Sequence, residues 1–135
     1  MKSRETLIRL KRFQVDENRR KVQQIDAMIS EFERMVADLD REIRAEQDRA
    51  GIHDPSHFAY PTYAKAAKQR RENLQRSADD LKLQREAANA ALEEADEELK
   101  KVELLGERDQ LREREESSRG EADLAILGLM RSASA

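Results

Sequence analysis

Two long helical patterns separated by one interior break constrain the fold of this 135-residue chain more than any other feature. The break is the segment Ala50–Thr62, which holds both prolines and both histidines. Gly51 suits the left-handed position that follows many helix ends. Pro55 and Pro61 each disfavour helix at the residue before them. The chain therefore predicts a helix, a turn and a second helix.

Apolar residues in the first half of the chain occupy the two core positions of a seven-residue repeat, as in a coiled coil. Before Val22 the repeat weakens, because Lys11 and Asn18 stand at core positions. A polar residue there lowers stability but can fix the alignment of two helices. The apolar members of the repeat are Val15, Val22, Ile25, Ile29, Phe32, Val36, Leu39 and Ile43.

In the second half, large residues alternate with alanine at the core positions. Alanines opposite the large residues of the first helix would let the two axes approach closely, which favours pairing within one chain. Arg85 is either a defect in this row or a side chain whose charged end reaches solvent. Thr62 is an acceptable N-cap, and proline is favoured in a first helical turn. The row is Ala67, Leu74, Ala78, Leu81, Arg85, Ala88, Leu92, Ala95, Leu99 and Val102.

Charge supports the same pairing. Charged residues make up 41% of the chain, against about a quarter in an average globular domain. Residues 1–21 hold eight Lys/Arg against three Asp/Glu, and residues 91–111 hold eight Asp/Glu against three Lys/Arg. Folding at the break brings these segments together. Acid–base pairs four residues apart, such as Asp16–Arg20 and Glu17–Lys21, add to helix stability. The sequence leaves the alignment of the two helices open. Apolar positions face each other both when the numbers of facing residues sum to roughly 113 and when they sum to roughly 117.

The expected fold is all-α: a long antiparallel two-helix coiled coil, or helical hairpin. A single domain covers residues 1–135, with a helix over about 2–50, a turn at 51–61 and a helix over about 62–118. Gly120 is expected to break the second helix, so that residues 119–135 form a C-terminal tail. Its last segment, Arg131–Ala135, is expected to be disordered.

Several functional classes find no support in the sequence. The absence of cysteine excludes a disulfide framework and a thiolate metal site. No apolar stretch approaches a membrane span or a signal-peptide core, so a soluble cytoplasmic protein is expected. There is no phosphate-binding glycine loop and no nucleophile–base set, so we expect neither enzyme activity nor a cofactor. His53 and His57 have a zinc-like spacing, but Pro55 lies between them and no third ligand is evident.

Two sets of residues are candidate interaction surfaces. At the hairpin tip, aromatic side chains form either a docking surface or a plug that closes the end of the core. At the open end, near the chain termini, apolar side chains lie where the second helix outruns the first. They form a partner-binding segment, pack back onto the start of the first helix, or self-associate. The tip set is Phe58, Tyr60 and Tyr63, and the open-end set is Leu7, Leu10, Phe13, Leu124, Leu127, Leu129 and Met130.

The N-terminal run Lys2–Glu17 and the tip sequence His57–Ala67 are the most specific segments of the chain. Together with the length and the hairpin plan, they make the chain resemble the FliJ family of flagellar type III export proteins over essentially its whole length. The tip sequence is similar to that of a subset of the family with a longer turn. The resemblance implies a coiled coil like the central stalk of rotary ATPases, with the open end in the pore of the hexameric export ATPase.

The resemblance also implies a cytoplasmic protein associated peripherally with the membrane at the flagellar base. It implies two further partners, the cytoplasmic domain of the export gate and the export chaperones. The free protein is expected to be a monomer. One alternative is a generic coiled-coil holdase chaperone or a dimeric scaffold. Another is a binder of nucleic acid or an anionic membrane surface, drawn by the basic N-terminal segment. We do not expect nucleic acid as a partner, because the acidic segment of the second helix lies opposite and neutralises the basic side chains of the N-terminal segment.

Overall fold

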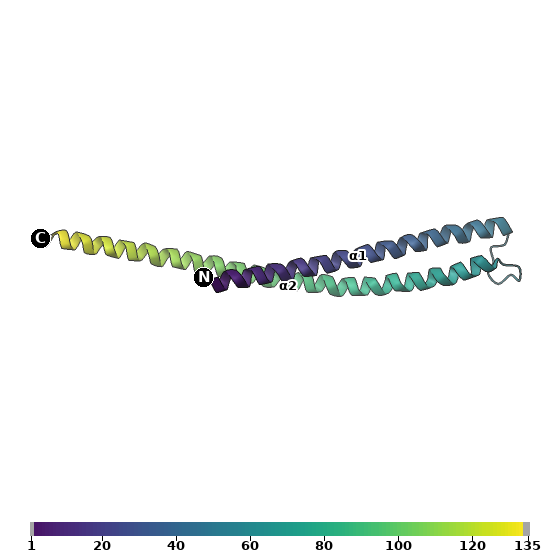
Figure 1. Cartoon of the computed structure of the whole chain (residues 1–135), viewed down its shortest axis with the longest axis horizontal. Helices are drawn as coiled ribbons and strands as arrows, with labels where there is room; N and C mark the ends of the chain where they lie inside the picture. Colours follow the sequence, from purple (N-terminus) through teal and green to yellow (C-terminus); the bar gives the residue numbers. More distant parts are fainter. Residues whose placement is uncertain (1, 134–135) are drawn as a thin grey trace. The chain divides into compact units, whose positions relative to one another are not determined.

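A computed structural model describes residues 2–133 of the chain. Within that range the chain forms two α-helices, α1 (Lys2–Ala50) and α2 (Thr62–Ala133), and no strand. The helices are joined by the turn at 51–61 and pack against each other in antiparallel directions (Figure 1). The all-α helical hairpin predicted from the sequence is therefore confirmed.

Packing divides the hairpin into two units, each with a segment of α1 beside a segment of α2 (Figure 1). We call Asp16–Glu93 the turn-end unit, and Met1–Val15 with Glu94–Ala135 the open-end unit. Of the open-end unit, the structure describes residues 2–15 and 94–133. Each unit is described by itself below.

The core of the turn-end unit follows the predicted repeat. Large α1 side chains and smaller α2 side chains form two buried clusters, and no charged or polar residue of the described chain is buried. Ala78 is completely covered, so α2 approaches α1 closely there. One cluster is Ile25, Ile29, Leu81 and Ala88 with Val22 and Phe32 against it, and the other is Leu39, Ile43 and Ala67 with Leu74 against it.

Ion pairs between α1 and α2 flank this core. In each of the three pairs named below, the two residue numbers add to between 111 and 115. The structure therefore favours the register in which facing residue numbers sum to roughly 113 over the one in which they sum to roughly 117. Arg85 is half-buried and its charged end reaches an α1 carboxylate, as expected for a long side chain that extends to solvent. The pairs are Arg71 Nε–Asp40 Oδ1 at 2.5 Å, Lys82 Nζ–Glu33 Oε1 at 3.0 Å and Arg85 Nη1–Asp26 Oδ1 at 3.3 Å.

The turn begins as the sequence predicts. Gly51 has a φ of 69°, and the Ile52 N–H donates a hydrogen bond of 3.2 Å to the carbonyl of Gln47. This bond satisfies a carbonyl at the end of α1 and is typical of a glycine-terminated helix. The assignment of Thr62 as N-cap is wrong by one residue. The Pro61 carbonyl accepts the first helical bond, from the Lys65 N–H at 3.1 Å, so Pro61 holds the cap position.

The second helix does not end near residue 118. It continues through Gly120 to Ala133, so the described part of the expected tail is helical. Glycine in a helix interior costs only about 1 kcal/mol relative to alanine. That cost does not stop a helix whose flanking residues propagate it well. The end of the expected disordered segment, residues 134–135, lies outside the described residues.

The close approach of the helices gives a stability prediction from two adjacent alanines. Ala88 is buried in the first cluster, whereas Ala87 is exposed. We expect Ala88→Leu to destabilise the hairpin by about 1–3 kcal/mol, because the added side chain overpacks the interface. Urea unfolding followed by circular dichroism measures this loss. Ala87→Leu is the control and should stay within about 0.5 kcal/mol. Equal effects of the two substitutions would contradict the assigned interface.

Candidate functional site

In the open-end unit the two helices meet at a glycine. Gly106 of α2 is buried, and a Cβ placed on it would lie 3.4 Å from the side chains of both Arg4 and Ile8 of α1. The α2 backbone at Gly106 therefore lies close to these two α1 side chains. Gly106 was not among the residues predicted to matter. Its signal is a lone glycine inside a strong helical pattern, which often has a packing reason.

Opposite charges hold the two helices of this unit in register. Arg4 pairs with Asp109 at 3.1 Å and with Glu113 at 3.7 Å. Lys11 Nζ lies 2.9 Å from Glu98 Oε2, and the hydrogen bond from Lys11 lowers the pKa of that carboxyl below its usual value. Arg12 pairs with Glu103 at 3.6 Å. The charge complementarity between the two segments, expected from the sequence, is thus present as specific pairs.

Every predicted open-end residue is exposed. Leu7, Leu10 and Phe13, which we call the α1 patch, are 42–58% exposed. The apolar residues of segment 124–130, which we call the α2 patch, are 53–72% exposed. The α2 patch comprises Leu124, Ile126, Leu127, Leu129 and Met130.

The α2 patch does not pack back onto the α1 patch. In the open-end unit the yellow C-terminal part of α2 continues past the start of α1 (Figure 1). At 1.5 Å per residue, Leu124 lies about 27 Å along the helix from Gly106, which is the level of Ile8. Every residue from 110 to 132 is exposed. Of the alternatives left open by the sequence, a partner-binding segment and self-association therefore remain.

At the hairpin tip the three aromatic residues have different roles. Tyr60 is 9% exposed, and its hydroxyl accepts a hydrogen bond of 2.8 Å from Gln47 Nε2. Lys68 Nζ lies 5.6 Å from the centroid of the Tyr60 ring, within reach of a cation–π interaction. Tyr60 therefore closes the end of the core. Phe58 is 97% exposed and stacks on His57 with ring centroids 4.8 Å apart, so it is free to contact a partner.

Tyr63 lies between these extremes. Its ring is 55% exposed, and its hydroxyl donates a hydrogen bond of 2.7 Å to Glu42 Oε2 on α1. This hydrogen bond to the carboxylate, together with its charge, raises the pKa of Tyr63. Tyr63 therefore links the first turn of α2 to α1, and one face of its ring stays accessible.

The two histidines serve the turn separately. His53 Nε2 lies 2.9 Å from Asp48 Oδ1, near the end of α1. His57 Nδ1 accepts a hydrogen bond from the Ala59 N–H at 3.0 Å. In the range 2–133 no group of three or more His, Asp or Glu side chains is arranged to hold a metal ion.

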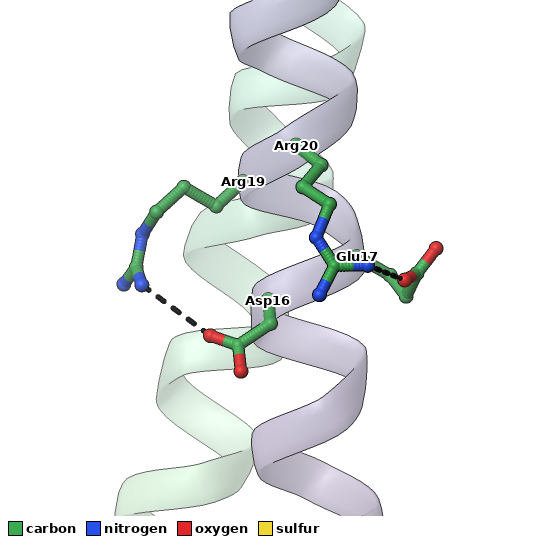
Figure 2. Close-up of polar contacts among 4 residues, drawn as sticks. All are labelled: Asp16, Glu17, Arg19 and Arg20. Carbon is green, nitrogen blue, oxygen red and sulfur yellow. Dashed lines mark hydrogen bonds and ion pairs between the residues drawn. The ribbon is translucent and has the colours of Figure 1, made fainter.

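Part of the basic N-terminal segment is neutralised on its own helix. Figure 2 shows Arg19 paired with Asp16 at 3.4 Å and Arg20 paired with Glu17, all on the surface of α1. The four-residue spacing in the sequence predicts that Asp16 pairs with Arg20. The structure uses the three-residue spacing, which also places two side chains on one helix face. These four residues therefore present paired charges to solvent.

A shallow hollow of about 350 Å³ lies along the turn-end unit. Its floor contains Leu39 and Ala67, and the charged groups among its lining residues are Asp38, Glu42 and Arg70. The lining has no Ser, Cys or His side chain, so it lacks the usual nucleophile–base pairs. In the described part of the chain, neither helix contains a stretch long and apolar enough to cross a membrane.

Comparison with known proteins gave no match to a protein-family model, a curated protein or a solved structure.

The tip gives a prediction that separates a structural aromatic from an accessible one. Tyr60→Ala should lower the free energy of unfolding by about 3 kcal/mol, because it removes a buried ring and leaves a cavity. Phe58→Ala should change it by less than about 0.5 kcal/mol, because that ring is in solvent. Urea unfolding of both variants measures the difference. A large loss for Phe58→Ala would contradict the assigned roles.

A second prediction concerns the Tyr63 hydroxyl. Its pKa is raised in the folded state, so its stabilising contribution is complete below the unfolded-state pKa and is lost as the pH rises through the folded-state pKa. Glu42→Gln should shift the alkaline titration of Tyr63 to lower pH, because the negative charge is removed. Tyrosinate absorbance measures the shift, and Tyr63→Phe identifies the signal. An unchanged titration in Glu42→Gln would show that the bond does not form in solution.

Proposed function

We propose that the chain is a non-enzymatic, FliJ-like component of the bacterial flagellar type III protein export apparatus. In this role it is a coiled-coil stalk and chaperone-escort protein. It binds the hexameric export ATPase through its open end and the cytoplasmic domain of the export gate through its tip. One observation carries the proposal: apolar side chains on both helices of the open-end unit are left uncovered.

The distribution of these side chains supports insertion of the open end into a partner. Leu124, Leu127 and Met130 follow one inclined row of α2, whereas Ile126 and Leu129 lie on the remaining sides, at 100° per residue. A helix that is apolar on all sides is usually buried. The pore of a ring-shaped ATPase is a partner that surrounds a helix and could cover every side at once.

The tip supports a second contact. A phenylalanine that is 97% exposed at the end of a turn contributes nothing to the hairpin core. Aromatic residues, phenylalanine among them, are enriched in the buried cores of protein–protein interfaces. Phe58 and the accessible face of Tyr63 are therefore the proposed contacts with the export gate.

The non-enzymatic role and the place at the cytoplasmic face of the membrane are proposed from the resemblance to the family. The hollow beside Leu39 and Ala67 lacks a nucleophile–base pair among its lining residues. The proposed location is the cytoplasm, with peripheral association at the flagellar base. Export chaperones are the third proposed class of partner, and the resemblance to the family is their only support.

The alternative is a generic coiled-coil holdase chaperone or a dimeric scaffold. The exposed leucines of the α2 patch also fit a surface that captures unfolded chains. A holdase should suppress aggregation of unrelated proteins and should have no specific effect on the ATPase. Measuring the effect of the protein on ATP hydrolysis by the ATPase therefore distinguishes the two functions.

The test is steady-state ATP hydrolysis by the cognate export ATPase, with and without the protein at matched concentration. We expect stimulation by the unmodified protein. Leu127→Asp with Leu129→Asp should weaken it by about tenfold or more, because charges cannot enter an apolar contact without a large cost. The control is Met28→Asp with Leu83→Asp, which places two charges at exposed sites of the turn-end unit.

The control pair should stimulate hydrolysis as the unmodified protein does. Circular dichroism should show full helicity for both variants. Equal stimulation by both would remove the α2 patch from the proposed surface. No stimulation by the unmodified protein would contradict the stalk role and favour the holdase.

A further inference from the structure

The open-end unit contains two apolar patches that cannot meet within one chain. The α1 patch lies at the start of α1, close to the level of Gly106. The α2 patch lies about 27 Å or more farther along α2, which is helical throughout. A continuous helix cannot fold back on itself, so each patch needs a covering surface from another molecule.

The two patches match each other in spacing. The α1 patch has Leu7, Leu10 and Phe13, and the α2 patch includes Leu124, Leu127 and Met130. In both sets the residues follow each other at intervals of three, so each set forms a ridge of equal length on its helix. Leu105 is 55% exposed and is a further exposed leucine of the open-end unit.

Charge favours the same match. Lys2 and Arg9 flank the first leucine of the α1 patch and make no ion pair within residues 2–133. Glu121 and Asp123 precede the α2 patch and are likewise unpaired in that range. In a pairing that runs in the same chain direction, these two acids would thus lie beside a segment of α1 that carries two unpaired bases.

We propose that two copies of the chain associate through their open ends, with the α2 patch of each copy packed against the α1 patch of the other. Two copies placed with their open ends facing run in opposite directions. The end of α2 in one copy then runs in the same direction as α1 of its partner, which places Glu121 and Asp123 near the basic start of that α1. The arrangement is two-fold symmetric, so both patches of both copies are covered at once.

This inference does not rest on the proposed function. The expectation of a free monomer was based on the hairpin interface, which is satisfied within one chain and stays intact in this dimer. The dimer would cover the surface proposed to bind the ATPase. Free protein would then be stored in a form that exposes fewer leucines to solvent.

Cysteine cross-linking tests the arrangement, because the chain contains no cysteine of its own. Leu10→Cys and Leu127→Cys proteins are mixed under mild oxidation without ATPase. We expect a disulfide between the two different chains to form at least about tenfold faster than for Leu83→Cys mixed with Leu127→Cys, because docking raises the effective thiol concentration. Leu83 is 66% exposed and lies in the turn-end unit, so it reports random collisions.

The double variant Leu10→Cys/Leu127→Cys should give a covalent dimer. A disulfide within one chain would show that α2 bends back, and it would overturn the proposal. Rates equal to the Leu83→Cys control would overturn it as well, as would a preference for joining two copies of the same single variant.

Sedimentation equilibrium of the unmodified protein gives a second readout that needs no cysteine. We expect a concentration-dependent monomer–dimer equilibrium that Leu127→Asp with Leu129→Asp shifts to monomer. A monomer at all concentrations would refute the dimer and leave the ATPase test unaffected.

Discussion

The close approach of two helices along one line of contact is the constraint on which this structure depends. The α1 side supplies branched residues such as Ile29 and Val36, whereas the α2 side supplies Ala78, Ala88 and, in the open-end unit, Gly106. A two-stranded hairpin has only one interface to bury. Small residues on one helix bring the large residues of the other into contact with the α2 backbone, which increases dispersion contacts.

The ion pairs beside this interface determine alignment more than stability. Surface pairs such as Lys82–Glu33 contribute at most about 1 kcal/mol each. Their effect is larger on an alternative pairing, because two copies of α1 paired in parallel would place the basic start of α1 beside itself. The charge pattern thus selects an antiparallel pairing within one chain. The apolar patches at the open end are outside this selection and remain available.

The sequence predicted the features that follow from periodicity and local turn chemistry. The seven-residue repeat located the buried face of α1, and Gly51 located its end. Periodicity says nothing inside a turn, where exposure depends on the backbone path, so it could not tell the buried Tyr60 from the exposed Phe58. It also could not show that α2 passes through Gly120, since the cost of one glycine is close to the gain from continuing the helix. Gly106 needed the partner helix to reveal its role, and the actual binding surfaces remain predictions.

The hairpin connection fixes the order in which contacts can form and break. The Gln47–Tyr60 bond joins residues 13 apart in sequence, whereas the Lys11–Glu98 bond joins residues 87 apart. The entropy cost of closing a loop rises with its length, so contacts near the turn form first and each one shortens the loop left for the next. A force that separates the two helices at the open end breaks these contacts one after another. The hairpin therefore yields to tension by unzipping in small steps, and the open-end contacts are released at low force while those beside the turn persist.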